Sequence, residues 1–166
     1  MGTARDPIEL ARDNWRSAGW ADSSDGMALV TSVMRVQQVL LTTIDDLLRP
    51  FGLTFARFEV LMLLHFSRVG ELPVGKIGER LQVHPASVTN AVNRLEGAGH
   101  VTRRPNADDG RSVLAAITAQ GRALVLDAAA TLNAEVFLNV PLPAAARHDL
   151  YELMRRWRSE FEDFDE

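Results

Sequence analysis

The stretch of residues 72–118, LPVGKIGERLQVHPASVTNAVNRLEGAGHVTRRPNADDGRSVLAAIT, decides the fold of this 166-residue chain. In its first part, over 73–81, apolar residues recur three and four positions apart, which is the spacing of a short helix with one buried face. After a break of three residues, Pro85 stands where a helix tolerates proline best, at a first position that needs no N–H donor. The spacing therefore predicts a second helix over 85–96, joined to the first by a tight turn.

The second predicted helix has one apolar stripe, formed by Val88, Ala91, Val92 and Leu95. A solvated helix would usually carry Glu and Lys on the opposite face, because both are strong helix formers that water tolerates well. Here that face has short polar side chains and one arginine. Asn can bond an adenine edge, Arg a guanine edge, and Ser, Thr and Ala can approach a thymine methyl group. We therefore expect this face to read DNA through Ala86, Ser87, Thr89, Asn90, Asn93 and Arg94.

Two β-prone runs follow, at 100–104 and 112–117, around a polar tip at 105–111. A helix-turn-helix pattern or a basic hairpin alone is common by chance. Joined in this order within fifty residues, they indicate a winged helix-turn-helix, in which the second helix docks in the major groove. The basic residues expected to join the DNA contact are Lys76 on the first helix and Arg103, Arg104 and Arg111 on the hairpin.

The same stretch resembles the MarR (multiple antibiotic resistance regulator) family of bacterial transcriptional regulators. The resembling residues are Ile77–Leu81, Pro85–Glu96, Gly99–Val101, Asp108–Leu114 and, beyond the hairpin, Ile117–Arg122. The resemblance implies that Arg111 enters the minor groove and that Asp109 holds it in place. One departure is His84, which stands at the N-cap position where Ser or Thr is expected.

The fold class expected from these features is mostly α with a small β-hairpin wing, a winged helix-turn-helix head and long terminal dimerisation helices. We expect one MarR-type domain in three parts: residues 1–53 for dimerisation, 54–118 for DNA binding and 119–166 for dimerisation. In the flanks we expect an amphipathic helix over 6–20, a turn over 21–26, a long helix over 26–49 stopped by Pro50, an apolar helix over 54–67 capped by Thr54, a helix over 118–138 capped by Thr118, and a last helix over 144–161.

Long first and last helices that lie far apart in sequence are what a two-fold dimer needs if both ends of the chain interlock with a second copy. One helix-turn-helix alone gives little specificity, whereas two held about 34 Å apart read successive half-sites. We therefore predict an obligate homodimer that binds double-stranded DNA at a palindromic operator.

The net charge of −4 is distributed unevenly. Residues 72–117 carry six basic and four acidic side chains, a net charge of +2, and the remainder carries −6. Phosphate attraction acts locally, because salt screens it beyond roughly 8–10 Å. A modestly positive head on an acidic body indicates weak non-specific binding, so specific binding has to rely on base and groove contacts as well.

Several classes of function lack the residues they need. The chain has no cysteine, which excludes disulfides, cysteine-ligated zinc and thiol redox sensing. Its four histidines have no paired spacing for a metal site, and there is no phosphate loop and no nucleophile elbow. We therefore expect neither enzymatic activity nor a cofactor. The adjacent carboxylates Asp45 and Asp46 are interpreted as solvated. We find no apolar run of roughly 18 residues and no signal peptide, so we expect a cytoplasmic protein without membrane contact.

Two hypotheses about function remain. The first is a repressor released by a small effector, which in the family is often phenolic or otherwise anionic and binds between the dimer helices and the DNA-binding head. The second is a protein-interaction or scaffold module without specific DNA readout. The polar and cationic side chains of the second helix argue against it, since a protein-binding face should present apolar anchors. Candidate effector contacts, which are equally well explained as core, are Trp20, Arg57, Phe58, Met62 and His65.

Overall fold

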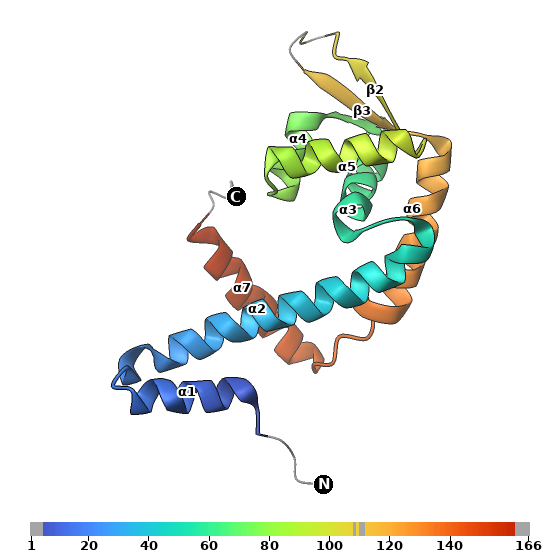
Figure 1. The fold of residues 1–166 in the computed structure, drawn as a ribbon. Coiled ribbons are helices and arrows are strands. Elements are labelled where there is room, and N and C mark those ends of the chain that lie inside the picture. The colour runs from blue at the N-terminus through green and yellow to red at the C-terminus, as the bar shows by residue number, and fades with distance from the viewer. Residues whose placement is uncertain (1–4, 108, 110–111, 162–166) are drawn as a thin grey trace. The chain divides into compact units, whose positions relative to one another are not determined.

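The computed structural model describes residues 5–107, 109 and 112–161, and it is mostly helical with one small antiparallel sheet (Figure 1). The expected fold class is confirmed. The chain divides into two compact units, Met1–Val125 and Leu126–Glu166. The elements are α1 (Pro7–Ser17), α2 (Ala21–Leu48), the 3₁₀ turn η1 (Arg49–Phe51), α3 (Phe55–Phe66), β1 (Glu71–Pro73), α4 (Val74–Leu81), α5 (Pro85–Gly97), β2 (Val101–Pro105), β3 (Val113–Ile117), α6 (Ala119–Leu132), the π-helical turn η2 (Asn133–Phe137) and α7 (Ala144–Ser159).

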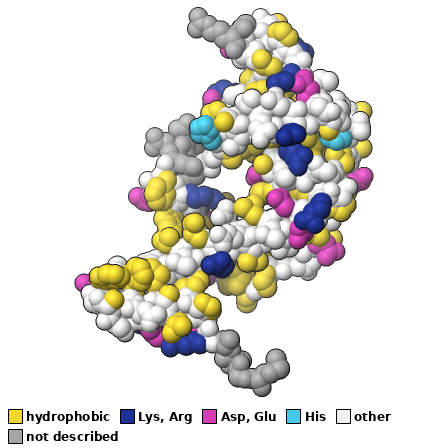
Figure 2. Space-filling view, in the orientation of Figure 1, with side chains coloured by type: hydrophobic (Ala, Val, Ile, Leu, Met, Phe, Trp, Pro, Cys, Tyr) yellow, Lys and Arg dark blue, Asp and Glu magenta, His cyan; other side chains and the backbone are white. Residues whose placement is uncertain are grey.

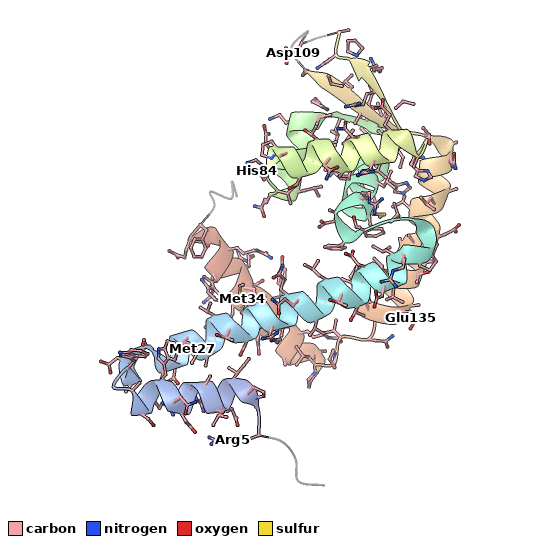
Figure 3. All side chains as sticks on the ribbon, in the orientation of Figure 1. Arg5, Met27, Met34, His84, Asp109 and Glu135 are labelled. Carbon is pink, nitrogen blue, oxygen red and sulfur yellow. The ribbon has the colours of Figure 1, made fainter. Side chains whose placement is uncertain are left out.

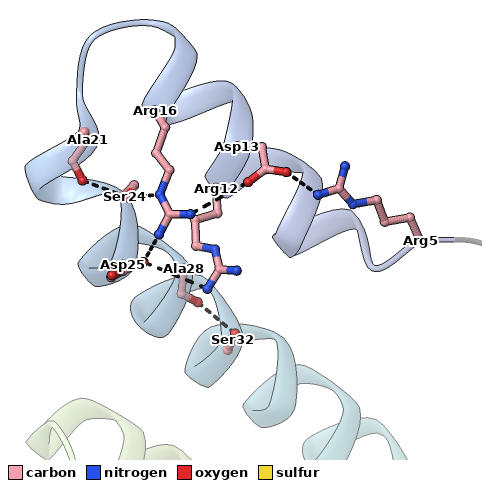
Figure 4. A network of polar contacts seen from close by, with 9 residues as sticks. All are labelled: Arg5, Arg12, Asp13, Arg16, Ala21, Ser24, Asp25, Ala28 and Ser32. Carbon is pink, nitrogen blue, oxygen red and sulfur yellow. Dashed lines mark hydrogen bonds and ion pairs between the residues drawn. The ribbon is translucent and has the colours of Figure 1, made fainter.

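The turn between α1 and α2 lies earlier than the sequence indicated, so the expected turn over 21–26 is wrong. The chain reverses at Gly19, whose φ of +90° lies in the left-handed region that glycine adopts easily. Ser24 and Asp25, two polar residues of that range, lie instead along the contact between the two helices (Figure 4). Arg16 donates from Nε to Ser24 Oγ at 3.1 Å and from Nη2 to Asp25 Oδ1 at 2.8 Å. These bonds hold α1 against the first turns of α2.

The beginning of α3 is fixed by a side chain from α2. Asp45 Oδ1 accepts a hydrogen bond from the Phe55 backbone N–H at 2.7 Å. Thr54 occupies the N-cap position, but its side chain makes no capping bond, and its Oγ1 accepts from Arg57 Nε at 3.2 Å instead. The expected cap by Thr54 and the expected solvation of Asp45 are therefore both wrong. The carboxylate reaches α3 because Pro50 ends α2 and the chain turns back through η1.

The core of the head lies between α3, α4 and α5. The four residues of the predicted α5 stripe are buried, with at most 7% of each exposed. They pack with α3, which buries Phe58, Val60, Leu61 and Leu64, and with Ile77 of α4. Each fully buried aliphatic or aromatic side chain stabilises the fold by roughly 1.5–3 kcal/mol. This packing leaves the opposite face of α5 pointing outward on a rigid base.

The sheet has three strands in the order β1-β3-β2, where the sequence predicted only the hairpin. The additional strand, β1, pairs antiparallel with β3, with Leu72 opposite Ala115. A strand of three residues that ends in Pro73 has no alternating pattern, so its sequence gives no signal. Because β1 leads directly into α4, the pairing joins the base of the wing to the helix-turn-helix.

The first turn of α6 packs closely on the turn that follows α5. Thr118 caps the helix as predicted, since its Oγ1 accepts from the Gly121 N–H at 3.0 Å and donates to Gly99 O at 2.8 Å. A Cβ atom at position 121 would lie only 2.2 Å from His100 O. Only glycine permits this approach. This accounts for Gly121 within the resembling residues Ile117–Arg122, which lie beyond the hairpin.

A large part of the apolar surface of α2 is uncovered within one chain. Ile44 and Leu48 are buried, whereas Leu29, Val36 and Leu40 are 45–57% exposed. Figure 2 shows hydrophobic side chains gathered over α1 and the beginning of α2. By length and composition alone, residues 21–51 are long and apolar enough to cross a membrane, with 6% of their most apolar window buried. The expectation that no stretch approaches a membrane span is therefore wrong by that measure.

The second unit also exposes apolar side chains. None of the residues of α7 is buried. Leu150, Tyr151 and Leu153 on this helix are 42–61% exposed. Exposed apolar surface of this extent is typical of surfaces that another molecule covers.

Candidate nucleic-acid interface

Helix α5 begins with a histidine cap. His84, at the start of the helix (Figure 3), accepts a hydrogen bond at Nδ1 from the Ala86 N–H at 3.2 Å. The imidazole thus replaces the Ser or Thr oxygen that usually binds an unpaired N–H in the first turn. Pro85, at the first helical position, needs no such partner.

The face of α5 that points away from the core is exposed along its whole length. It includes all six residues that the sequence assigned to DNA reading: Ala86, Ser87, Thr89, Asn90, Asn93 and Arg94. One of them, Thr89, uses its hydroxyl to donate to Pro85 O at 3.0 Å. The structure therefore brings the side chains predicted to read DNA together on one surface. Their contacts with DNA remain a prediction.

One flank of this face is tied to the wing by Arg103 of β2. This guanidinium donates from Nη1 to Asn93 Oδ1 and from Nε to Glu96 Oε2, both at 2.7 Å. The hydrogen bond from Arg103 lowers the pKa of the Glu96 carboxyl below its usual value. Arg103, expected from the sequence as a DNA contact, thus fixes the base of the wing relative to α5.

Two further basic residues of the expected contact, Arg104 and Lys76, also have acidic partners. Arg104 donates to both carboxylate oxygens of Glu71, at 2.6 and 3.2 Å, across the central strand of the sheet. Lys76 Nζ lies 2.6 Å from Glu79 Oε2 on the same helix. Ion pairs this exposed contribute roughly 0–1 kcal/mol. Exchanging them for DNA phosphates therefore costs little.

The tip of the wing is held by its own polar groups. The Ser112 N–H donates to Asp109 O at 2.9 Å, and Asn106 Nδ2 donates to Ser112 Oγ at 2.8 Å. Asp109 lies at the end of the hairpin (Figure 3). Arg111 lies outside the described residues, so its expected entry into the minor groove and its orientation by Asp109 stay predictions.

The other flank of α5 borders an open cleft of about 560 Å³. Residues at the beginning of α3 form its second wall. The cleft is lined by Thr54, Ala56, Arg57, Ser87, Asn90, Ala91 and Arg94. Arg57, which the sequence suggested as an effector contact, therefore lies beside the predicted DNA-reading face. No sequence pattern signals this, because Arg57 and Arg94 belong to different helices.

Comparison with known proteins decides the identity of this fold. The MarR family model matches residues 51–112. An HTH-type transcriptional repressor of Mycobacterium tuberculosis is 33% identical over 111 residues, which cover 67% of this chain and 78% of the repressor. The crystal structure of a MarR family transcriptional regulator from Streptomyces coelicolor is 48% identical, covers 86% of this chain and 99% of its own, and superposes with a TM-score of 0.78. The chain belongs to the MarR family.

As a member of the MarR family, the chain is a DNA-binding transcriptional regulator. A mutant MarR of Escherichia coli, solved in complex with operator DNA, shares the fold with a TM-score of 0.71 at 24% identity. That match covers 81% of this chain and 96% of the other. The winged helix-turn-helix that the sequence predicted is thus the architecture of the family.

The five candidate effector residues of this MarR-family regulator do not share one place. Trp20 is 55% exposed and packs on Trp15, with ring centroids 5.0 Å apart. Phe58 is in the core, and Met62, one turn further along α3, is half-buried. His65, also half-buried, lies with Nδ1 2.9 Å from Arg122 Nη1. The remaining candidate is Arg57, which precedes His65 by eight residues and so lies about 12 Å from it along the axis of α3.

Over residues 5–107, 109 and 112–161, no group of three His, Cys, Asp or Glu side chains is arranged to hold a metal ion.

Proposed function

We propose that this regulator is a repressor that binds a palindromic operator as a homodimer and is released by a small phenolic or otherwise anionic effector. One observation carries the proposal: an exposed, continuous α5 face of short polar side chains and one arginine, mounted on a buried apolar stripe. The repressor of Mycobacterium tuberculosis and the regulator of Streptomyces coelicolor, both similar over most of their length, support it.

The homodimer is supported by the uncovered apolar surface of each unit. In the first unit α2 exposes Leu29, Val36 and Leu40, and in the second unit α7 exposes Leu150 and Leu153. A second copy that covers these side chains removes them from water, which stabilises the assembly by about 25 cal/mol for each Å² buried. Two copies of α5 then face successive major grooves of one operator.

A dimer interface explains the apolar character of α2 without a membrane. The helix carries Arg35 in its middle, where the guanidinium donates to Gln38 Oε1 at 3.0 Å. A charge at the centre of a bilayer costs several kcal/mol, whereas at the rim of a protein interface it stays in water. A repressor that binds genomic DNA works in the cytoplasm, which is where we place this one.

Release by an effector requires a coupling free energy of only about 1–3 kcal/mol between effector and DNA. The five residues suggested from the sequence are spread over the α1–α2 corner and the length of α3. We therefore assign the effector no contact among them. The competing scaffold hypothesis is weaker, because the exposed face of α5 offers no large apolar side chain as an anchor.

The proposal is tested by titrating the purified protein against a fluorescent duplex from its own upstream intergenic DNA, with a scrambled duplex as control. Anisotropy should show saturable binding that prefers the upstream duplex at physiological salt, with two protomers per site. Equal and weak binding to both duplexes, together with no preferred site in a genomic-fragment selection, contradicts the proposal and favours the scaffold hypothesis.

A further inference from the structure

Among the residues that the structure describes, the lining of the cleft beside α5 includes two arginines and no carboxylate. Arg57 enters from α3 and Arg94 from α5, and the other lining residues are the hydroxyl, amide and methyl groups of Thr54, Ser87, Asn90, Ala56 and Ala91. A concave surface lined by one sign of charge concentrates ions of the opposite sign. Guanidinium, hydroxyl and amide N–H groups are all hydrogen-bond donors, which is the chemistry that recognises an oxyanion.

These two arginines differ from Arg103 and Arg104 of the wing in having no acidic partner. Arg103 and Arg104 are paired with Glu96 and Glu71. Among the described residues, by contrast, the Arg94 guanidinium has no hydrogen-bond or ion-pair partner, and the Arg57 guanidinium has only the neutral Thr54 hydroxyl. Two like charges therefore face one open space with their donor groups available.

A nearby carboxylate does not neutralise the cleft. Asp45 lies with Arg57 in a smaller neighbouring cleft of about 320 Å³. Its Oδ1 accepts the Phe55 N–H at 2.7 Å, which fixes the carboxylate at the start of α3. Among the described contacts, this carboxylate forms no ion pair with Arg57. Asp45 thus holds the backbone beside the cleft without pairing with either guanidinium group.

The position of the cleft indicates which oxyanion it receives. The cleft lies on the flank of the α5 face that is not tied to the wing, so an α5 docked in the major groove brings this flank toward the edge of the groove. Backbone phosphates line that edge, and a guanidinium binds a phosphate with two parallel N–H···O bonds. A free phosphate offers the same chemistry, and the experiment must separate the two sources.

We propose that Arg57 and Arg94 together hold one backbone phosphate of the operator, so that the DNA contact extends beyond the winged helix-turn-helix to the beginning of α3. The proposal rests on the proposed DNA-binding function. It changes the role of two residues: Arg57 moves from the effector to the DNA, and Arg94 positions the helix on the phosphate backbone instead of reading a guanine. Base reading is left to the N-terminal half of the α5 face.

The test compares full-length wild type with Arg57→Gln on the upstream and scrambled duplexes over a salt series. A lost phosphate contact weakens binding to both duplexes by a similar factor, about tenfold at physiological salt, and leaves their ratio unchanged. The slope of log K against log[salt] should become shallower by roughly 2, because each of two protomers loses about one phosphate. Arg57→Lys, which keeps the charge, should recover most of the slope.

Arg68→Gln is the matched control. Arg68 is exposed just after the other end of α3 and does not line the cleft, so its removal changes the net charge equally without removing the contact. Its slope should equal that of wild type. Unchanged thermal melting of both variants shows that the fold is intact.

Duplexes with a single neutral methylphosphonate identify the source of the phosphate. At one position in each half-site, the methylphosphonate should weaken DNA binding by the wild type to the level of Arg57→Gln. Binding of Arg57→Gln to the modified duplex should be no weaker than its binding to the unmodified one. If wild type prefers the upstream duplex but Arg57→Gln keeps its slope, the phosphate contact is overturned while the repressor stands. Millimolar binding of inorganic phosphate with an unchanged slope also overturns it. If wild type shows no specific binding at all, the proposed function itself fails.

Discussion

At the scale of single residues, the arginines of the head differ in their contacts: some bind other side chains of the protein, and others line an open cleft. Arg103 joins β2 to α5 through Asn93 and Glu96, so its main effect is on the angle between wing and helix. Arg57 and Arg94 face an open cleft instead. All three lie near the predicted DNA face, and their sequence positions alone do not distinguish these roles.

The contact between Glu96 and Arg103 should depend on pH. The folded protein lowers the pKa of this carboxyl, so the contact stabilises the fold fully above the unfolded value of about 4.3. That contribution is lost as the pH falls through the lower folded value. Because the hydrogen bond from Arg103 is the largest cause, Arg103→Gln should move the pKa of Glu96 upward. An NMR titration of the Glu96 side-chain carboxyl in both proteins measures this, and identical midpoints contradict the contact.

At the scale of elements, α5 shows what local pattern determines. Its buried stripe, its limits and its exposed face follow from the spacing of Val88, Ala91, Val92 and Leu95 and from Pro85, and all agree with the structure. The local pattern did not predict contacts between residues that are distant in the sequence. The Phe55 N–H is capped from position 45, and β1 exists only because β3 lies beside it. The cleft of Arg57 and Arg94 likewise requires two helices to be packed before it exists.

The cap from α2 gives a prediction about stability. Asp45→Ala leaves the Phe55 N–H without its acceptor at a half-buried position, and loss of a helix cap typically lowers the free energy of unfolding by about 1 kcal/mol. The matched control is Asp46→Ala, which removes only an exposed ion pair with Arg49 and should change stability by much less. Urea denaturation of the two variants measures the difference. Equal losses would mean that Asp45 does not cap α3.

At the scale of the whole molecule, the apolar residues of the long helices could be predicted from the sequence, but their exposure could not. Leu29, Val36 and Leu40 have the spacing of a buried stripe, yet one chain leaves them in water. Helical periodicity indicates that one face of a helix is buried. It does not distinguish burial within one chain from burial by a second copy. The structure therefore supplies the observation that supports a second copy.

The dimer gives a prediction that one substitution can test. Leu40→Glu places a charge on the uncovered stripe of α2, so the protein should sediment as a monomer at micromolar concentration and lose operator affinity. Gln38→Glu lies on the opposite side of the same helix and keeps an acceptor for Arg35, so it should leave the dimer intact. Wild type sedimenting with the mass of a single chain would overturn the homodimer.

In the proposed complex, two α5 helices read successive major grooves of one operator. Dimethyl sulfate, which methylates guanine N7 in the major groove, tests it most directly on the upstream duplex. We expect two protected patches with centres about 10 base pairs apart, one turn of B-DNA, that disappear together when the protein is removed. Saturable binding without major-groove protection, or with a single protected patch, would contradict it.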